Sequence, residues 1–118
     1  MNGKLSTHVL DNYFGKPAEG IPWKLEVAGG GSEWSKISDG KTNQDGRTDV
    51  PLLEGDSLRT ACYRITFKIA GYYESREVEL ASPPFLDEIL ITVNLVAGEN
   101  YHVPLLMTPW SYSTYRGS

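Results

Sequence analysis

Two runs in which every second residue is apolar restrict the fold of this chain more than any other feature. The first run places Tyr63, Ile65, Phe67 and Ile69 on one face, and the second places Ile89, Ile91, Val93 and Leu95 on one face. Because successive side chains of a β-strand point to opposite faces, a period of two indicates strands with one buried face. The chain must therefore bury at least two such faces against each other or against another layer.

The same alternation, in shorter form, predicts strands elsewhere. In residues 5–11, one face holds Leu5, Thr7 and Val9, and the opposite face holds Ser6, His8 and Leu10. In residues 21–28, one face holds Trp23, Leu25 and Val27, and the opposite face holds Lys24 and Glu26. We expect a short strand over 34–38, and one or two strands over 101–115 that are interrupted at Pro104 and Pro109. Turn-forming residues predict connections at 12–17, 29–32, 39–49 and 97–100.

One helix is expected among these strands. Gly71 is predicted to end the strand that begins at Tyr63, and the charged stretch 74–80 then favours one short helix before Pro83 and Pro84. Several short strands joined by Gly- and Asn-containing turns are typical of an all-β sandwich. A length of 118 residues suits one domain spanning 1–118.

Charge and cysteine content exclude several classes of function. Lys and Arg are scattered in a chain of net charge -4, so we expect no nucleic-acid partner and no anionic membrane surface. There is no apolar run long enough to span a membrane and no secretory signal pattern near Met1, which favours a cytoplasmic protein. Cys62 is the only cysteine, so no intrachain disulfide forms, and we interpret it as a small packed residue.

The two histidines, His8 and His102, are the main candidates for chemistry. Each lies on a predicted strand among residues that do not belong to the core, so each is expected on the outer face of the sandwich, where a subunit interface could shelter it. Zinc would need three protein ligands, and even with Asp11 the chain offers no clear set, so we predict no metal. A serine triad through Ser6, Ser113 or Ser118 lacks the Gly-x-Ser-x-Gly elbow.

General acid-base catalysis with water as the attacking group therefore suits the sequence best. Imidazole titrates near ~6.5, so it can take a proton from water and return it near neutral pH. Arg47 and Arg116 are the candidate arginines, because a guanidinium can hold a flat anionic substrate or a developing oxyanion. No cofactor is predicted.

Four stretches of the sequence together resemble the 5-hydroxyisourate hydrolases, the enzymatic branch of the transthyretin-like family. They are Ser-Thr-His-Val-Leu-Asp around His8, Asp-Gly-Arg ending at Arg47, Tyr-His-Val-Pro-Leu-Leu around His102, and the terminal Tyr115-Arg116-Gly117-Ser118. The resemblance implies a transthyretin-like β-sandwich of two four-stranded sheets with one short helix, assembled as a homotetramer that is a dimer of dimers. It implies hydrolysis of 5-hydroxyisourate, without cofactor, to 2-oxo-4-hydroxy-4-carboxy-5-ureidoimidazoline in urate (purine) catabolism.

The resemblance also assigns roles to residues. It implies that His8, His102 and Arg47 are catalytic, that Arg47 also binds the substrate or its oxyanion, and that Tyr115, Arg116, Gly117 and Ser118 line the substrate pocket. It leaves open which histidine is the general base. Departures from the family pattern occur at Asn100, at Met107-Thr108 and in Phe85-Leu86-Asp87-Glu88; they bear on the pocket and its loops rather than on the chemistry.

Two other classes of function stay open at this point. The first is a non-enzymatic carrier that holds a small aromatic ligand in a channel lined by Leu106, Tyr112 and Tyr115. The second is an Ig-like interaction domain, which would be monomeric and indifferent to the loss of His8. One fold can serve as an enzyme, a carrier or an interaction domain, so the function has to be inferred from the site residues.

Overall fold

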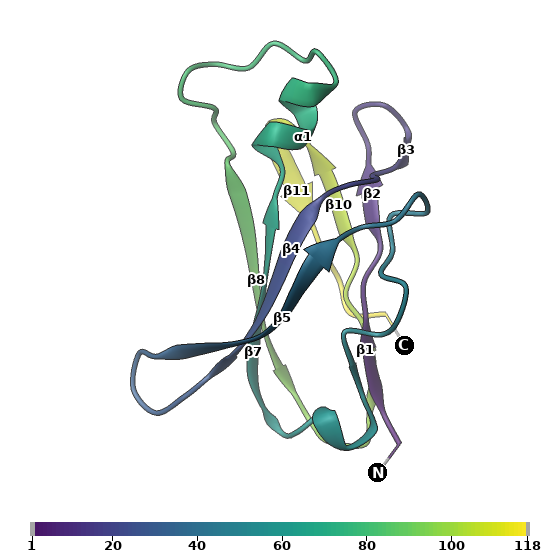
Figure 1. Cartoon of the computed structure of the whole chain (residues 1–118), viewed down its shortest axis with the longest axis vertical. Coiled ribbons are helices and arrows are strands. Elements are labelled where there is room, and N and C mark those ends of the chain that lie inside the picture. The colour runs from purple at the N-terminus through teal and green to yellow at the C-terminus, as the bar shows by residue number, and fades with distance from the viewer. Residues whose placement is uncertain (1, 118) are drawn as a thin grey trace.

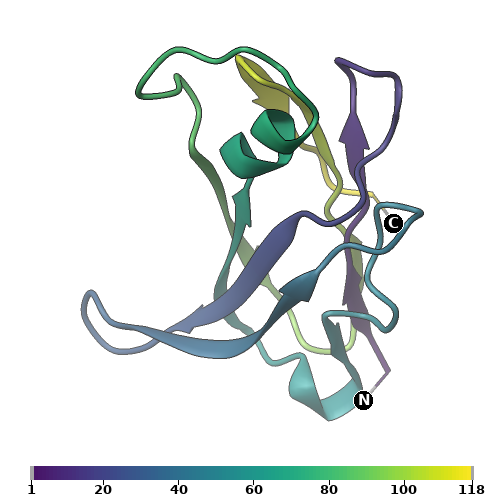
Figure 2. The same ribbon diagram turned by 45° about the horizontal axis from the view of Figure 1, so that its top comes forward.

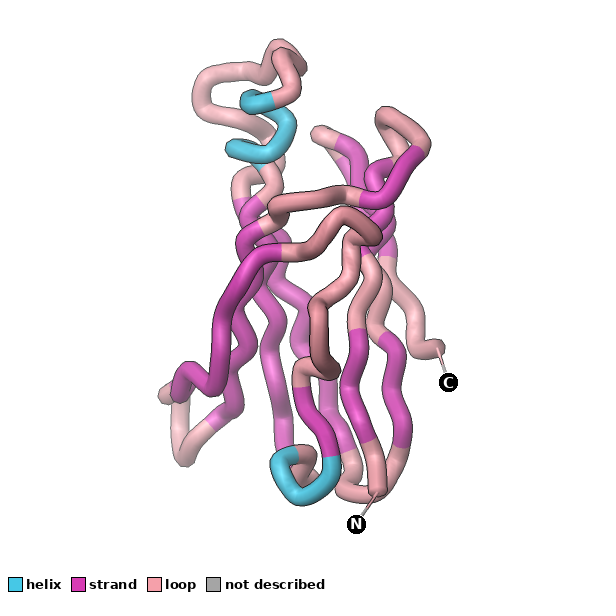
Figure 3. Tube along the Cα trace, turned by 45° about the vertical axis from the view of Figure 1, so that its right-hand side comes forward, coloured by secondary structure: helices cyan, strands magenta, loops and turns pink. Residues whose placement is uncertain are grey.

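The computed structural model describes residues 2–117 and arranges them in two facing β-layers (Figures 1 and 3). The first layer is an antiparallel four-stranded sheet with the order β5-β4-β7-β8. Its strands are β4 (Pro22–Ala28), β5 (Trp34–Lys41), β7 (Ala61–Lys68) and β8 (Glu88–Leu95). The two alternating runs thus pair with each other, as β7 with β8.

The second layer contains two smaller sheets. A four-stranded sheet has the order β11-β10-β2-β3 and consists of β2 (Val9–Asp11), β3 (Lys16–Pro17), β10 (Leu105–Thr108) and β11 (Ser111–Ser113). A three-stranded sheet has the order β6-β1-β9 and consists of β1 (Lys4–Ser6), β6 (Leu53–Glu54) and β9 (Asn100–His102). The predicted sandwich is therefore confirmed, with this additional sheet.

The two small sheets form one continuous layer. The β1 chain runs on into β2, the β9 chain runs on into β10, and both pairs are parallel. Between them, the Val103 N–H donates to the Ser6 carbonyl and the Leu105 N–H donates to the His8 carbonyl, each at 2.9 Å. Pro104 has no N–H to donate, so the regular ladder is interrupted here although the chains stay side by side.

The core lies between the two layers and is made by the alternation seen in the sequence. The side chains on the inner faces of both layers are fully buried; they include Leu5, Val9, Leu25, Tyr63, Ile65, Phe67, Leu105 and Met107. Burying each of these large apolar side chains contributes about 1.5–3 kcal/mol before the entropic cost of ordering the chain. Since Leu5 and Val9 point inward, Ser6 and His8 are left half-buried on the outer face of the second layer.

The helix lies earlier in the chain than the sequence predicted. Strand β7 ends at Lys68, and α1 spans Ala70–Ser75 at one end of the sandwich (Figure 2), so the predictions that Gly71 ends the strand and that the helix occupies 74–80 were wrong. Long-range bonds explain the difference: the buried Asp11 carboxylate accepts the hydroxyls of Tyr72 and Tyr73 at 2.7 and 2.9 Å. A short 3-10 helix also occurs at Gly55–Ser57.

Strand β5 is longer than predicted, because it extends through Lys41 rather than ending near Ser38. Gly40 stands opposite Trp23 of β4, and a Cβ at Gly40 would lie only 3.0 Å from the indole Cζ2. Because Gly40 has no side chain, Trp23 can pack over the edge strand β5. The prediction of a turn-rich connection over 39–49 did not account for this packing.

Glu26 on β4 is buried, although the alternation placed it on the exposed face. Arg64 on β7 binds the Glu26 carboxylate through two nitrogens at 3.0 and 2.9 Å. This pairing compensates the burial of the charge. Within residues 2–117, the structure has no helix that is long and apolar enough to cross a membrane.

Candidate active site

His102 is held on the outer face of the second layer by its position opposite Ser6. In the parallel pair β1–β9 the register sets Ser6 against His102, and the Ser6 Oγ lies 2.9 Å from the His102 Nδ1. His8 follows two residues after Ser6 and shares the outer face with it. The structure therefore brings the two histidines of the sequence to one face, although they are far apart along the chain.

A tight loop presents Arg47 to the same face. The Asn43 Oδ1 accepts the N–H groups of Asp45 and Arg47 at 2.9 and 3.1 Å, and the Asn43 N–H donates to the Arg47 carbonyl at 2.8 Å. An asparagine that closes a turn in this way fixes the residues that follow it. The hydrogen bonds of Asn43 therefore fix the backbone conformation of the turn that leads to Arg47.

Gly46 attaches this loop to the start of β2, directly after His8, which lies between β1 and β2 rather than within the continuous strand predicted over 5–11. Its φ of +75° lies in the left-handed region, and a Cβ at this position would collide with the Val9 carbonyl oxygen. The Val9 N–H in turn donates to the Gly46 carbonyl at 2.7 Å. Only glycine meets both requirements, so the Asp-Gly-Arg sequence has a structural reason.

The hydrogen bond between His8 and the loop determines where His8 carries its proton. The His8 Nε2 lies 2.9 Å from the Asp45 carbonyl oxygen. A carbonyl oxygen only accepts hydrogen bonds, so the neutral ring must carry its proton on Nε2 and leave Nδ1 as a free lone pair. The Asp45 backbone is a functional group that the sequence analysis missed; the Asn-x-Asp-Gly pattern, typical of such a turn, is the signal for it.

The surroundings of both histidines favour the neutral ring by lowering its pKa. Burial lowers the pKa of His8, and the Arg47 charge lowers it further, while the hydrogen bond to Asp45 acts in the opposite direction. Burial also lowers the pKa of His102, followed by the charge of Arg47 and then the charge of His8. Arg47 thus acts on both rings, and two neutral imidazoles beside one guanidinium are suited to acid-base chemistry near neutral pH.

The terminal segment reaches His102 through its backbone. Gly117 donates its N–H to the His102 carbonyl at 2.7 Å and accepts the His102 N–H at 3.2 Å. Ser118, predicted to line the pocket, lies outside the described residues. The roles of these two residues toward substrate stay predictions.

The structure does not bring the side chains of Tyr115 and Arg116 to the histidines of the same chain. The Arg116 guanidinium lies over the Tyr101 ring at 4.6 Å and near the Glu99 carboxylate at 3.5 Å. Tyr115 is 60% exposed, and both residues line a separate depression of about 290 Å³ against β8. Their predicted contact with substrate stays untested.

The structure does not favour a metal site or a serine triad. The carboxylate of Asp11, considered as a metal ligand, is fully buried and bonded to two tyrosine hydroxyls. Among residues 2–117 no three His, Cys, Asp or Glu side chains gather in a way that could hold a metal ion. Of the triad serines, Ser6 contacts a histidine, and Ser113 is exposed on β11.

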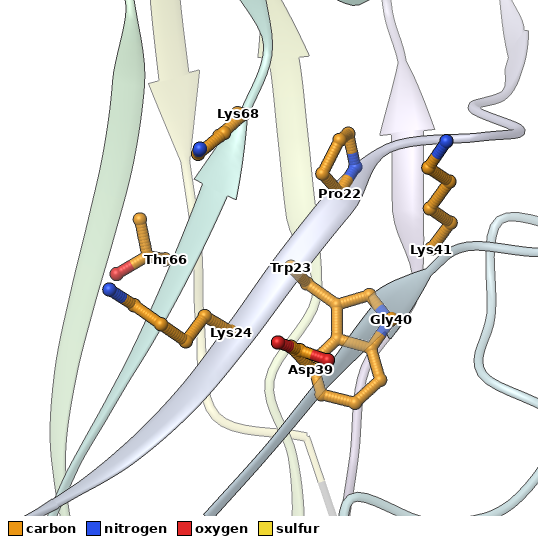
Figure 4. A pocket seen from close by; sticks show the side chains of 8 residues that line it. All are labelled: Pro22, Trp23, Lys24, Asp39, Gly40, Lys41, Thr66 and Lys68. Carbon is orange, nitrogen blue, oxygen red and sulfur yellow. The ribbon is translucent and has the colours of Figure 1, made fainter. Parts of the chain in front are cut away.

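A larger hollow lies on the other layer and is separate from the histidines. It has a volume of about 340 Å³ and is lined by residues of β4, β5 and β7 (Figure 4). Its lining includes three lysines, Lys24, Lys41 and Lys68. The Lys24 Nζ lies 3.9 Å from the Glu26 carboxylate, and Asp39, the acidic residue among the described lining residues, is bonded to Lys36. It contains none of the predicted catalytic groups.

The model of the HIUase/Transthyretin family matches residues 5–117 of this chain, which covers nearly all of it. The chain belongs to the HIUase/Transthyretin family. Among relatives, the 5-hydroxyisourate hydrolase of Deinococcus radiodurans is 48% identical over 117 residues, covering 97% of this chain and 95% of the relative.

Solved structures of the family agree with the fold. A crystal structure of (S)-allantoin synthase is 37% identical with a TM-score of 0.92; the match covers 99% of this chain and 44% of that longer chain. The 5-hydroxyisourate hydrolase of Klebsiella pneumoniae is 28% identical with a TM-score of 0.79, and the match covers 98% of this chain and 94% of that chain. Sea bream transthyretin, solved with thyroxine, is 22% identical with a TM-score of 0.86, and the match covers 97% of this chain and 94% of that chain. At that identity the similarity shows the fold alone. The transthyretin-like sandwich predicted from the sequence is confirmed.

Proposed function

We propose that this chain hydrolyses 5-hydroxyisourate, opening its ring to 2-oxo-4-hydroxy-4-carboxy-5-ureidoimidazoline. The observation that carries the proposal is the gathering of His8, His102 and Arg47 on one face of the second layer, where burial and the Arg47 charge lower the pKa of both imidazoles. The names of relatives such as the Deinococcus radiodurans hydrolase support the same reaction.

His8 acts as the general base in this proposal. Its Nδ1 is the lone pair left free when Nε2 donates to the Asp45 carbonyl. As water attacks the ring amide carbonyl, Nδ1 takes one water proton and a carbon–oxygen bond forms. When the tetrahedral intermediate collapses, the carbon–nitrogen bond breaks and the same proton passes from His8 to the leaving nitrogen. The products are a ureido N–H and a carboxylic acid, which releases the second water proton to solvent and becomes a carboxylate, and His8 is neutral again.

Arg47 stabilises the negative charge that forms during this attack. The oxygen of the attacked carbonyl becomes an oxyanion, and a guanidinium that is already in place stabilises it without further rearrangement. Its position beside both histidines is supported by the lowering of both imidazole pKa values through its charge. Arg47 also suits a flat substrate rich in carbonyl oxygens, since its donors form a planar fork.

Assembly into a homotetramer, a dimer of dimers, would give this face its cover. His8 and His102 are only half-buried in one chain, and a second copy of the same face across a two-fold axis would exclude water from them. This arrangement needs no metal and no cofactor.

A carrier role is less well supported. A carrier requires an apolar channel, whereas the outer face here holds Ser6, His8 and His102, and nothing about carriage requires neutral imidazoles beside an arginine. An Ig-like interaction domain likewise has no use for these groups.

The deciding experiment follows freshly generated 5-hydroxyisourate with and without the purified protein. We expect acceleration over the spontaneous decay, and a loss of turnover on the order of 10² to 10⁴ in His8→Ala and in His102→Ala. The double mutant should lose far less than the product of the two factors, because the histidines act on one reaction as a unit. Lys68→Ala, on the other layer, is the matched control. A folded single mutant with near-normal turnover would show that its histidine is not catalytic.

A further inference from the structure

Ser6 contacts His102 on the outer face of the second layer. Its Oγ lies 2.9 Å from the His102 Nδ1. Both backbones are fixed, because the Ser6 carbonyl accepts the Val103 N–H at 2.9 Å and His102 is bonded in both directions to Gly117. The serine hydroxyl is therefore held against one nitrogen of the ring, and the other nitrogen, Nε2, is left for the substrate.

The chemistry of the pair selects one direction for this hydrogen bond. An imidazole lone pair is a far stronger base than a hydroxyl oxygen, so the favoured arrangement has the Ser6 O–H donating to Nδ1. The His102 proton then resides on Nε2. Arg47 favours the neutral ring, because its positive charge disfavours a second proton on His102.

We propose that Ser6 is a positioning residue that holds His102 in the Nε2–H tautomer, so that His102 donates a hydrogen bond to the developing oxyanion. The role toward the oxyanion rests on the proposed function. The two histidines are then complementary: Asp45 makes His8 a proton acceptor at Nδ1, and Ser6 makes His102 a donor at Nε2. One backbone carbonyl and one hydroxyl thereby give two identical side chains opposite roles.

A nucleophilic Ser6 is the competing explanation of the same contact. In a nucleophile–base pair, a third group orients the base through its second ring nitrogen. Here Ser6 itself holds the ring through Nδ1, and within residues 2–117 no contact described for His102 holds its Nε2. A positioning residue can be lost with partial activity, whereas a nucleophile cannot, and this difference is measurable.

The first test needs no substrate. Nitrogen NMR of the histidine-labelled protein reports the tautomer of each ring, and the two histidines are assigned with His8→Ala. We expect the Nε2–H form of His102 in the native protein and a mixture of both tautomers in Ser6→Ala. An unchanged His102 tautomer in Ser6→Ala would overturn the proposal, whatever the protein hydrolyses.

The second test is kinetic. Ser6→Ala should lower kcat about 10- to 50-fold with KM changed less than about twofold, as expected for a group used only in the transition state. Ser6→Thr, which keeps the hydroxyl, should restore most of this loss, and Ser35→Ala on exposed β5 is the matched control. In a His102→Ala background, Ser6→Ala should cost less than about twofold, because the residue acts through His102.

The outcomes separate the proposals. Loss of all turnover in Ser6→Ala, together with failure of Ser6→Thr, would replace the positioning role by a nucleophilic one. A normal kcat in Ser6→Ala would overturn the role in turnover. If the native protein does not act on 5-hydroxyisourate while the tautomer shifts as expected, the proposed function fails and the link between Ser6 and His102 stands.

Discussion

Gly117 and His102 are joined by two backbone hydrogen bonds, so the end of the chain is attached directly to a predicted catalytic residue. A Cβ at Gly117 would lie 3.0 Å from the His102 Cβ and 3.2 Å from its Cδ2. This close approach explains why a glycine occupies the position: any side chain would push either the terminal segment or the imidazole out of place.

Gly117→Ala is therefore expected to reduce turnover at least about tenfold, which corresponds to ~1.4 kcal/mol of transition-state stabilisation. Deletion of residues 115–118 should have an effect at least as large. Steady-state kinetics on folded samples of unchanged oligomeric state measure both.

Gly71→Ala is the matched control for this prediction. A Cβ at Gly71 would meet nothing within 4 Å, and the residue lies in α1, so alanine should be neutral or stabilising by up to about 1 kcal/mol. Full activity in Gly117→Ala would show that the terminal segment has no influence on His102.

The sequence predicted that Ser6 and His8 face outward, but not which residues they would meet. Alternation in residues 5–11 placed Ser6 and His8 on one face, and this is a local property of a strand. The contact between Ser6 and His102 joins positions 96 residues apart through a parallel register that no short-range pattern specifies. Likewise, the Asp45 carbonyl is a backbone group, and its role depends on the turn that Asn43 closes.

Removing the charge of Arg47 should raise the pKa of both histidines. In Arg47→Met the effect of burial stays and the repulsion is lost, while Asp45 continues to raise the pKa of His8. Titration of the imidazole signals by NMR should show both midpoints moving upward. Arg59→Met, at an exposed arginine, is the control and should leave both midpoints in place. Unchanged midpoints in Arg47→Met would contradict the placement of Arg47 beside the rings.

The same lowered pKa values predict the direction of the pH dependence of stability. An unfolded histidine takes up its proton near pH ~6.5, while the native histidines do so only at lower pH. Below ~6.5 the unfolded state therefore binds more protons, and these two groups lower the free energy of unfolding until the native rings are protonated too. Urea unfolding at a series of pH values should show this decrease weakened in Arg47→Met.

Asp11 is expected to be one of the most sensitive positions for stability. Its carboxylate is fully buried and accepts the hydroxyls of Tyr72 and Tyr73, which stay protonated because burial and Asp11 raise the pKa of both phenols. Asp11→Ala removes the shared acceptor of two buried hydroxyls and leaves Tyr73 only the longer contact with the Met107 carbonyl at 3.3 Å, so it should cost about 3 kcal/mol of unfolding free energy.

Urea unfolding provides the measurement, with Asp39→Ala as its control. Asp39 is exposed and bonded only to Lys36 among the contacts described for it, so its loss should change stability by less than about 0.5 kcal/mol. Equal stability of the two variants would mean that Asp11 does not hold α1 on β2. The anchor of α1 shows why the predicted helix was placed too late in the chain: Asp11 lies 61 and 62 residues away from the tyrosines that it holds.

A cluster of exposed aromatic side chains marks where copies of the chain should meet in the proposed tetramer. Tyr13, Phe14 and Trp110 are each 43–52% exposed, and the Tyr13 ring contacts the other two edge-on at 4.9 and 5.7 Å. A contiguous aromatic surface of this kind favours burial against another subunit. We expect light scattering to show a homotetramer for the native protein and a shift toward smaller species at micromolar concentration in Trp110→Gln.

Phe85→Gln tests whether this effect belongs to the cluster or to any exposed aromatic residue. Phe85 is 75% exposed and lies in the loop between α1 and β8, so its replacement should leave the assembly intact. If the half-buried histidines depend on a neighbouring copy for shelter from water, turnover of Trp110→Gln should fall with dilution in parallel with the tetramer fraction, while that of Phe85→Gln should not. A native protein that is fully active as a monomer would contradict both the assembly and the argument that it completes the site.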